Sequence, residues 1–263
     1  MKMNYKISIF LLIMGLFLLI PSGTTNSQLN IVGSTSVQPI CEELVDEYKK
    51  THNDVDINVQ GGGSNLGIKC TNNCLADIGM SSKEVNESNL IEYEIGVEGI
   101  AIVVNPANPI DDLSTAQIRN VFSGNVSDWS EISNHSGKIN VIVREEGSGT
   151  LDSFKYSIMN FTEIREDAII QNSAGAIKQI VADDKNAIGF VSLTHLDGSL
   201  KDIGIDNVKI SRESVLNKSY SLQRPFVLLT DKTPDEETLS FINWTLSNES
   251  SQIFEKEKVI KID

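Results

Sequence analysis

The stretch Arg144-Glu-Glu-Gly-Ser-Gly-Thr150 joins an expected strand, residues 139–144, to a helix that begins near Ser148. A strand that runs through a glycine-rich turn into a helix is a building unit of α/β folds. The first N–H groups of a helix are unpaired and its dipole is positive there, so an anion is stabilised at that end. The stretch therefore predicts an anion site on an α/β fold.

Two further turns of the same kind occur earlier in the chain, Gly33-Ser-Thr-Ser36 and Gly61-Gly-Gly-Ser64. A single turn of this type is typical of an ordinary helix N-cap, but three of them favour a shared site. The surrounding pattern alternates short β-rich runs with amphipathic stretches. It predicts strands at 29–32, 55–59, 77–80, 95–105, 139–144, 187–192 and 220–229, and helices at 39–50, 64–73, 114–122 and 235–246, with two more starting near Ser148 and Ala174.

Side chains in these turns add chemistry suited to an oxyanion. The hydroxyls of Thr35, Ser64, Ser148 and Thr150 are hydrogen-bond donors. Arg144 offers a fixed, planar fork of N–H groups that fits an oxyanion. Glu146 lies two residues further on, where it is expected to orient that fork; a solvated surface pair is the alternative for these two residues.

The order of the expected elements divides the chain into two α/β lobes. Residues 28–104 and 192–263 are expected to form the first lobe, and residues 105–191 the second. Two crossings, near Val104-Asn105 and near Phe190-Val191, would then form a hinge. A hinge of this kind allows a cleft to close around a ligand.

Residues 1–27 are expected to be a secretory signal or an N-terminal anchor. Lys2 and Lys6 precede the apolar run 7–20, which is followed by Pro21 and small residues. The run is shorter than the roughly 20 residues of a membrane-spanning helix, which favours cleavage, with a retained anchor as the alternative. An exported protein, at the cell surface or in a periplasm-like space, is therefore expected.

Asn-x-Ser/Thr sequons agree with a glycosylated protein outside the cytoplasm. They begin at Asn86, Asn125, Asn134, Asn160, Asn217, Asn243 and Asn248.

Charge and cysteine content exclude several classes of function. The formal net charge of −14 argues against a nucleic-acid partner, which requires a basic face. Cys41, Cys70 and Cys74 are an odd number, so they do not make a fully paired disulfide framework. Because the three histidines are scattered, no metal site is expected, and no cofactor motif is apparent.

The motifs together resemble the phosphate-binding protein of the high-affinity phosphate ABC transporter, the PstS type. The resemblance is carried by the stretch 144–150, by Gly33-Ser-Thr-Ser-Val-Gln-Pro39, by Gly62-Gly-Ser64 and by Asp77-Ile-Gly-Met-Ser-Ser82, in the same order along the chain. It implies a bilobal type II periplasmic-binding-protein fold with a two-strand hinge. It also implies inorganic phosphate as ligand and a membrane permease as partner.

The same resemblance implies which residues bind phosphate. Thr35, the backbone N–H of Ser36, and Ser64 would act from one lobe, and Arg144, Ser148, Gly149 and Thr150 from the other.

Ser82 stands where better-known members of the family have an aspartate that accepts the phosphate proton. Glu146 replaces their usual aspartate beside the arginine, and Asp77 and Glu146 are the nearest acidic candidates for that role. Asp77 as a structural cap of neighbouring N–H groups is the alternative. A serine hydroxyl can both donate and accept, so lower selectivity against sulfate is expected.

Other functions compatible with the sequence are binding of sulfate or molybdate, a Ser148-dependent hydrolase, and a surface adhesin or structural glycoprotein. Hydrolysis is disfavoured because Ser148 is not in a Gly-x-Ser-x-Gly elbow, and neither His135 nor His195 has a catalytic context. We therefore expect a binding protein and not an enzyme.

Overall fold

The computed structural model describes residues 27–85 and 87–262. The expected signal or anchor, apart from its last residue, and the sequon asparagine Asn86 lie outside the described residues. Within those two ranges, no helix combines the length and the apolar character needed to cross a membrane.

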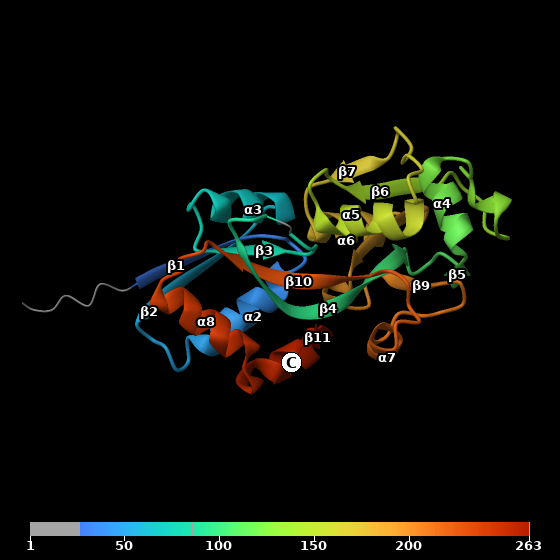
Figure 1. The fold of residues 1–263 in the computed structure, drawn as a ribbon. Helices are drawn as coiled ribbons and strands as arrows, with labels where there is room; N and C mark the ends of the chain where they lie inside the picture. The colour runs from blue at the N-terminus through green and yellow to red at the C-terminus, as the bar shows by residue number, and fades with distance from the viewer. Residues whose placement is uncertain (1–26, 86, 263) are drawn as a thin grey trace, which may run out of the picture.

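The chain forms an α/β fold with two lobes (Figure 1). The first lobe contains β1 (Ser27–Gly33), α2 (Gln38–Tyr48), β2 (Val55–Gly61), α3 (Ser64–Asn72), β3 (Ile78–Ser81), α8 (Glu236–Leu246), the 3-10 helix η4 (Asn248–Ser250), α9 (Ser251–Lys256) and β11 (Ile260–Lys261). The second contains β5 (Asp112–Leu113), α4 (Thr115–Ser123), η1 (Trp129–Glu131), β6 (Asn140–Arg144), α5 (Gly149–Phe154), the π-helix η2 (Lys155–Met159), β7 (Ile169–Gln171), α6 (Ala174–Asp183), β8 (Ala187–Ser192), η3 (Leu193–His195), β9 (Lys201–Ile205) and α7 (Arg212–Leu216).

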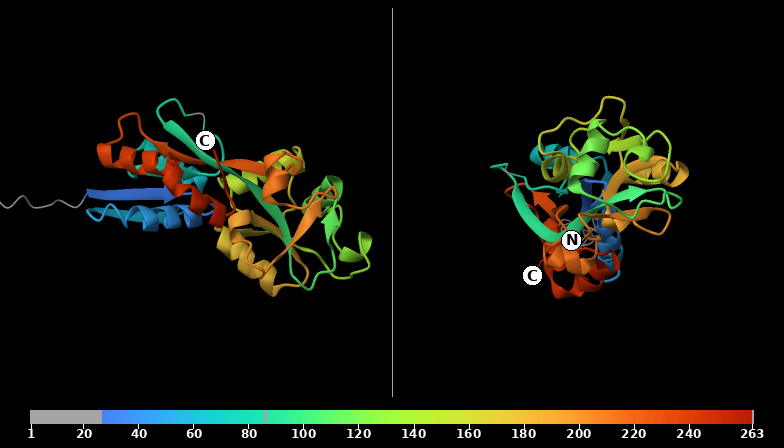
Figure 2. Two further views of the ribbon diagram at one scale, coloured as in Figure 1. Left: turned by 90° about the horizontal axis from the view of Figure 1, so that it is seen from below. Right: turned by 90° about the vertical axis from the view of Figure 1, so that its right-hand side faces the viewer.

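Strands β4 (Ile91–Val104) and β10 (Gln223–Thr230) connect the lobes, and β4 runs obliquely from one to the other (Figure 2). In the first lobe β2, β1 and β3 are parallel, and β10 lies antiparallel between β3 and β4. Figure 1 shows α3 on one face of this sheet and α2 and α8 on the other. α2 packs against the sheet because Ile40, Leu44 and Tyr48 recur at helical spacing and are fully buried.

The second lobe has its own core around a sheet in which β8 pairs antiparallel with β4 and parallel with β6. The rings of Phe122 and Phe190 both contact Phe154, with centroids 4.6 and 4.3 Å from its own. Trp129 is fully buried, and its Nε1 donates to the backbone oxygen of Asn186. Burying large aromatic rings removes much apolar surface from water, which stabilises this lobe independently of the first.

Both crossings between the lobes lie at other positions in the structure than the sequence predicts. β4 pairs with β10 up to Gly99, and from Ile100 onward it pairs with β8. Residues from Leu200 to Leu222 belong to the second core, and β9 pairs with the end of β4. The expected boundaries at 104/105 and 191/192 therefore do not match the packing, because the last residues of β4, up to Val104, and β8, up to Ser192, pair with each other in the second lobe's sheet. The lobes join at 99–100 and 222–223.

Candidate functional site

The polar loops of the first lobe lie at one edge of its sheet. β1, β2 and β3 are parallel neighbours, so their carboxyl ends and the loops that follow them meet there. These loops bring together four serines that are almost completely buried: Ser34, Ser36, Ser64 and Ser82. Since a buried hydroxyl is costly without a hydrogen-bond partner, the four side chains are arranged to bond with one another and with the second lobe.

Ser82 is the centre of this group. Its Oγ accepts from Ser34 Oγ at 3.0 Å and lies 3.2 Å from Ser64 Oγ. Its backbone N–H donates to Ser64 Oγ at 3.1 Å. The structure thus brings together Ser64 and Ser82, which are far apart in sequence, as expected for one site.

The second lobe adds Arg144 and the start of α5. Arg144 ends β6 with only 3 % of its surface exposed, and its Nε and one terminal nitrogen donate to the carboxylate of Glu145 at 2.8 and 2.9 Å. Ser148 is the N-cap of α5, with its Oγ accepting from the N–H of Leu151. Ser148, Gly149 and Thr150 are all buried. A fixed cation therefore lies next to the first turn of a helix.

Contacts between the lobes occur at the same point. Ser36 Oγ and Thr150 Oγ1 are 3.2 Å apart, although they come from different lobes. Thr35 Oγ1 accepts from the backbone N–H of Ala174, at the start of α6, at 3.4 Å. The loop after β1 therefore meets two helix N-termini of the second lobe, and the hydroxyls expected from sequence converge between the lobes.

Gly149 allows this close approach. A Cβ at this position would lie 2.5 Å from Ser82 Oγ and 2.8 Å from Ser64 Oγ, both in the first lobe. Contacts that short are not tolerated, so a larger residue here would hold the lobes apart.

Glu146 does not orient Arg144; the neighbouring Glu145 does. The backbone N–H of Ser148 donates to Glu145 O, which closes a turn with Gly147 at a φ of +90°. A positive φ at the third position is typical of a type II turn, in which the second residue, here Glu146, is at the corner. Its side chain is 80 % exposed and pairs with Lys155 at 2.6 Å.

Asp77 lies at the opposite end of β3 from Ser82. One of its carboxylate oxygens accepts from the backbone N–H of Asn30 at 2.7 Å. It therefore caps neighbouring backbone, and the alternative interpretation of this residue agrees with its position.

A second buried arginine, Arg224, reaches the site and was not expected there. It lies at the start of β10, directly opposite Glu98 on β4. Its Nε donates to Glu98 Oε1 at 2.9 Å, and its Nη1 donates to Ser82 Oγ at 3.0 Å and to Thr150 Oγ1. Glu98 is fully buried, and its other oxygen accepts from Ser192 Oγ. Arg144 is therefore not the only cation at this point.

The signal that could have identified Arg224 is its context. Both Arg224 and Glu98 are charged residues within strands that are otherwise mostly apolar. A charge inside a buried strand requires a partner, so the two strands had to pair with these residues face to face.

Burial dominates the electrostatics of this pair. Burial raises the pKa of Glu98, whereas Arg224 and Ser192 act to lower it. Burial lowers the pKa of Arg224, and the positive charge of Arg144 lowers it further, whereas Glu98 acts to raise it. The effect of Arg144 indicates that the two guanidinium groups lie within electrostatic reach of each other. Burial also lowers the pKa of His195 to about 4, so this imidazole is neutral near pH 7.

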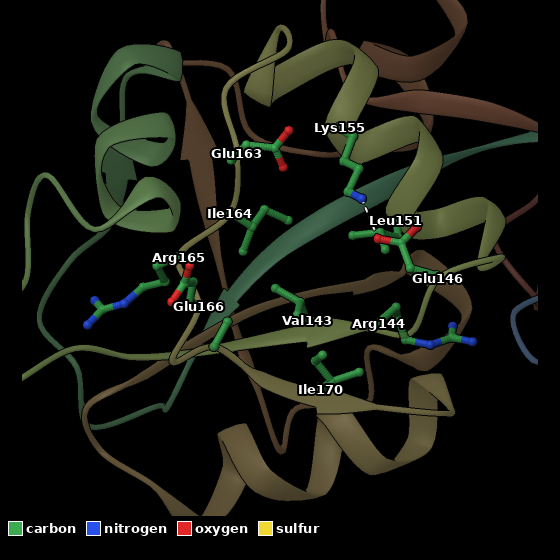
Figure 3. A pocket seen from close by; sticks show the side chains of 11 residues that line it. Val143, Arg144, Glu146, Leu151, Lys155, Glu163, Ile164, Arg165, Glu166 and Ile170 are labelled. Carbon is green, nitrogen blue, oxygen red and sulfur yellow. Dashed lines mark hydrogen bonds and ion pairs between the residues drawn. The ribbon is translucent and has the colours of Figure 1, made fainter.

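A pocket of about 230 Å³ lies in the second lobe, and Arg144 and Glu146 are among the residues that line it. Figure 3 shows Val143, Ile164 and Ile170 at its centre, with the Arg144 side chain extending away from them. The guanidinium therefore points out of this pocket, which is separate from the interlobe junction.

The geometry around Ser148 does not form a nucleophilic triad. His135 Nε2 is 3.2 Å from Asn186 Oδ1, and His195 Nδ1 is 3.1 Å from Thr194 Oγ1. Neither ring is hydrogen-bonded to Ser148 within residues 27–85 and 87–262. These ranges also contain no group of three or more His, Cys, Asp or Glu placed to hold a metal ion. The three cysteines are free thiols, and burial raises the pKa of Cys41 to about 12.

Comparison with known proteins agrees with this geometry. Residues 21–249 match the model of the PBP superfamily domain. A solved structure of a putative phosphate ABC transporter substrate-binding protein with bound phosphate, from Clostridium perfringens, is 34 % identical; the match has a TM-score of 0.87 and covers 90 % of this chain and 100 % of that one. An ABC-type phosphate transport receptor from Vibrio cholerae is 30 % identical, with a TM-score of 0.73, and the match covers 89 % and 100 % of the two chains.

Among curated relatives, the phosphate-binding protein PstS of Bacillus subtilis is 28 % identical over 204 residues, which cover 75 % of this chain and 68 % of the relative. These relatives are substrate-binding proteins of transporters and not enzymes. The chain therefore belongs to the PBP superfamily, in its branch of PstS-type phosphate-binding proteins.

Proposed function

We propose that this protein binds inorganic phosphate between its lobes outside the cytoplasm and delivers it to the permease of a phosphate ABC transporter. The observation that carries the proposal is the convergence of donors from both lobes on one point. Ser36 and Thr150 meet there across the junction. The buried Arg144 lies within electrostatic reach of Arg224, which donates to Thr150. An oxyanion with several acceptor oxygens is the ligand that such an all-round set of donors fits.

Each part of the site has a distinct role in this proposal. Arg144, fixed by Glu145, supplies charge and two-pronged geometry. The backbone N–H groups of Gly149 and Thr150, at the start of α5, donate to the anion. Hydroxyl groups then complete its coordination: Thr35, Ser36, Ser64, Ser82, Ser148 and Thr150.

Release requires the lobes to separate. β4 and β10 are the two connections, so we propose that the hinge lies at residues 99–100, where β4 changes its partner from β10 to β8, and at residues 222–223, where β10 begins. Opening there would break the Ser36–Thr150 contact and expose the anion to the permease.

Titration calorimetry of the purified mature protein with phosphate, sulfate and molybdate tests the proposal. We expect tight, saturable binding of phosphate. Tighter binding of sulfate or molybdate would instead establish the protein as a carrier of another oxyanion. Turnover of a phosphate ester that disappears in Ser148→Ala would establish a hydrolase. No binding of any oxyanion would overturn the proposal.

A further inference from the structure

Arg224 contacts both halves of the proposed site. Its Nη1 donates to Ser82 Oγ in the first lobe and to Thr150 Oγ1 in the second. The side chain is 1 % exposed and comes from the strand that connects the lobes. The Arg224 guanidinium therefore lies where the two lobes would enclose an anion, and it is within reach of the donors of either lobe.

Glu98 fixes this guanidinium. Its Oε1 accepts from both Nε and Nη2 of Arg224, and its Oε2 accepts from Ser192 Oγ, which lies 2.7 Å from Thr194 Oγ1. A buried ion pair is a poor source of stability, because desolvation offsets much of the attraction. Arg224 of this ion pair also donates to Ser82 and Thr150, which belong to the proposed site. This favours a functional role for the ion pair.

Arg224 also sets the direction of the hydroxyl groups around it. A guanidinium N–H can only donate, so Ser82 Oγ must accept from it, and Ser82 Oγ also accepts from Ser34 Oγ. With both lone pairs engaged, the Ser82 hydroxyl is left as a donor. It cannot then accept a hydrogen bond from a protonated oxygen of the ligand, as the aspartate of related proteins is expected to do.

The carboxylates near the site are engaged as well. Both oxygens of Glu98 have partners, and both oxygens of Glu145 accept from Arg144. A ligand with two protons, dihydrogen phosphate, would find few acceptors here. A ligand with one proton and two charges would be matched by the two guanidinium groups.

We infer that Arg224, positioned by Glu98, is a second cation of the phosphate site, and that the charge of its guanidinium makes the site prefer hydrogen phosphate, the dianion, over dihydrogen phosphate. The inference rests on the proposed function. The charged or titratable groups around Arg224 are Glu98 on β4, Arg144 on β6 and His195 on η3. Because the pKa of His195 is held near 4, it does not titrate above about pH 5.

The test measures the affinity for phosphate from about pH 5 to about pH 9, a range that includes the second ionisation of phosphate. Wild-type affinity should rise through that ionisation and then level off. Arg224→Gln/Glu98→Gln replaces the ion pair by neutral amides of similar shape; its affinity at the upper pH should fall by roughly tenfold to a hundredfold, with a shallower pH dependence.

Two single variants complete the experiment. Glu98→Gln keeps the guanidinium, so it should retain the pH dependence; losing it would assign the pH effect to Glu98 and overturn the inference. Arg119→Gln removes an arginine that donates to the backbone oxygen of Ile158, away from the site, and should bind as wild type does. Thermal unfolding of each variant checks that it is folded.

Unchanged affinity and pH dependence in the folded double variant would overturn the inference but leave the proposed function intact. A wild-type affinity that does not rise with pH would overturn the preference for the dianion. A wild-type protein that does not bind phosphate at all would overturn both proposals.

Discussion

The two lobes contribute different chemistry to the point where they meet. The first lobe brings buried neutral hydroxyls, with Ser82 at their centre, whereas the second brings the buried cation Arg144 with its carboxylate partner Glu145. A hydroxyl can donate or accept, but a guanidinium only donates. We therefore expect the second lobe to impose the negative charge of the ligand and the first lobe to fit its shape.

Removal of Arg144 should produce the largest effect and is the strongest test of this difference. In Arg144→Ala the bound anion loses its charged partner in the second lobe, which costs about 3–5 kcal/mol, or roughly a hundredfold to several thousandfold in affinity. Ser64→Ala removes one neutral donor of the first lobe and should cost about 0.5–1.5 kcal/mol. Titration calorimetry measures both.

The matched control is Arg165→Ala, which removes an arginine of the same lobe that pairs with Asp167. Its affinity should equal that of the wild type. An affinity of Arg144→Ala within about tenfold of wild type would contradict the division of roles between the lobes.

Gly149→Ala should have the second largest effect, because it interferes with the fit between the lobes and leaves all charges in place. The added methyl group would meet the Ser82 and Ser64 hydroxyls, and overpacking of this kind costs about 1–3 kcal/mol, or roughly tenfold to a hundredfold in affinity. Small-angle scattering should show a radius of gyration that decreases less with phosphate than in the wild type.

Gly175→Ala is the control for this variant, since a Cβ at Gly175 has no atom of another residue within 4 Å apart from its chain neighbours and its own helix backbone. If Gly149→Ala bound phosphate as tightly as this control, the contact between α5 and the first lobe would not be part of the bound state.

The smallest effect is expected from Lys83 and Asp152, which form an ion pair across the junction at 2.5 Å. Both side chains are partly exposed, at 26 % and 37 %, and such pairs are worth about 0–1 kcal/mol. Lys83→Ala should raise the dissociation rate of phosphate by no more than about fivefold, and high salt should remove the difference.

Stopped-flow measurements on Lys83→Ala, Asp152→Ala and the double variant would isolate this pair. Lys155→Ala is the control, because Lys155 pairs with Glu146 within one lobe. If the change in dissociation rate persisted at high salt, the Lys83–Asp152 pair would act by more than electrostatic attraction between the lobes.

Most of the secondary structure could be predicted because hydrophobic periodicity reports it directly. The strands at β1, β2 and β8 and the helices at α2 and α8 lie within a few residues of their expected positions. The sequence pattern does not predict β9, because the strand begins with Lys201 and Asp202 and only Ile203-Gly-Ile205 remains as an apolar run. A prediction without β9 ends the second lobe at residue 191, ahead of the point where β10 begins.

The site was predictable to the extent that it is local in sequence. Ser148, Gly149 and Thr150 stand together because one turn contains them. The local pattern marks Arg224 only as a charge within a mostly apolar strand. Its place in the site depends on the register between β4 and β10, which are far apart in the chain. That Glu145 and not Glu146 pairs with Arg144 depends on the type of the turn at 145–148. The positive φ of Gly147 determines that type.

The position of the return crossing also determines the order in which the molecule can be built. The second lobe is one uninterrupted segment, residues 100–222, whereas β10 must insert between β3 and β4 to complete the sheet of the first. Contacts between distant segments are slow to form, because the intervening chain must close a long loop. We therefore expect the second lobe to complete its core first. The first lobe should remain partly folded until β10, which follows the second lobe in the chain, has been synthesised and can insert between β3 and β4.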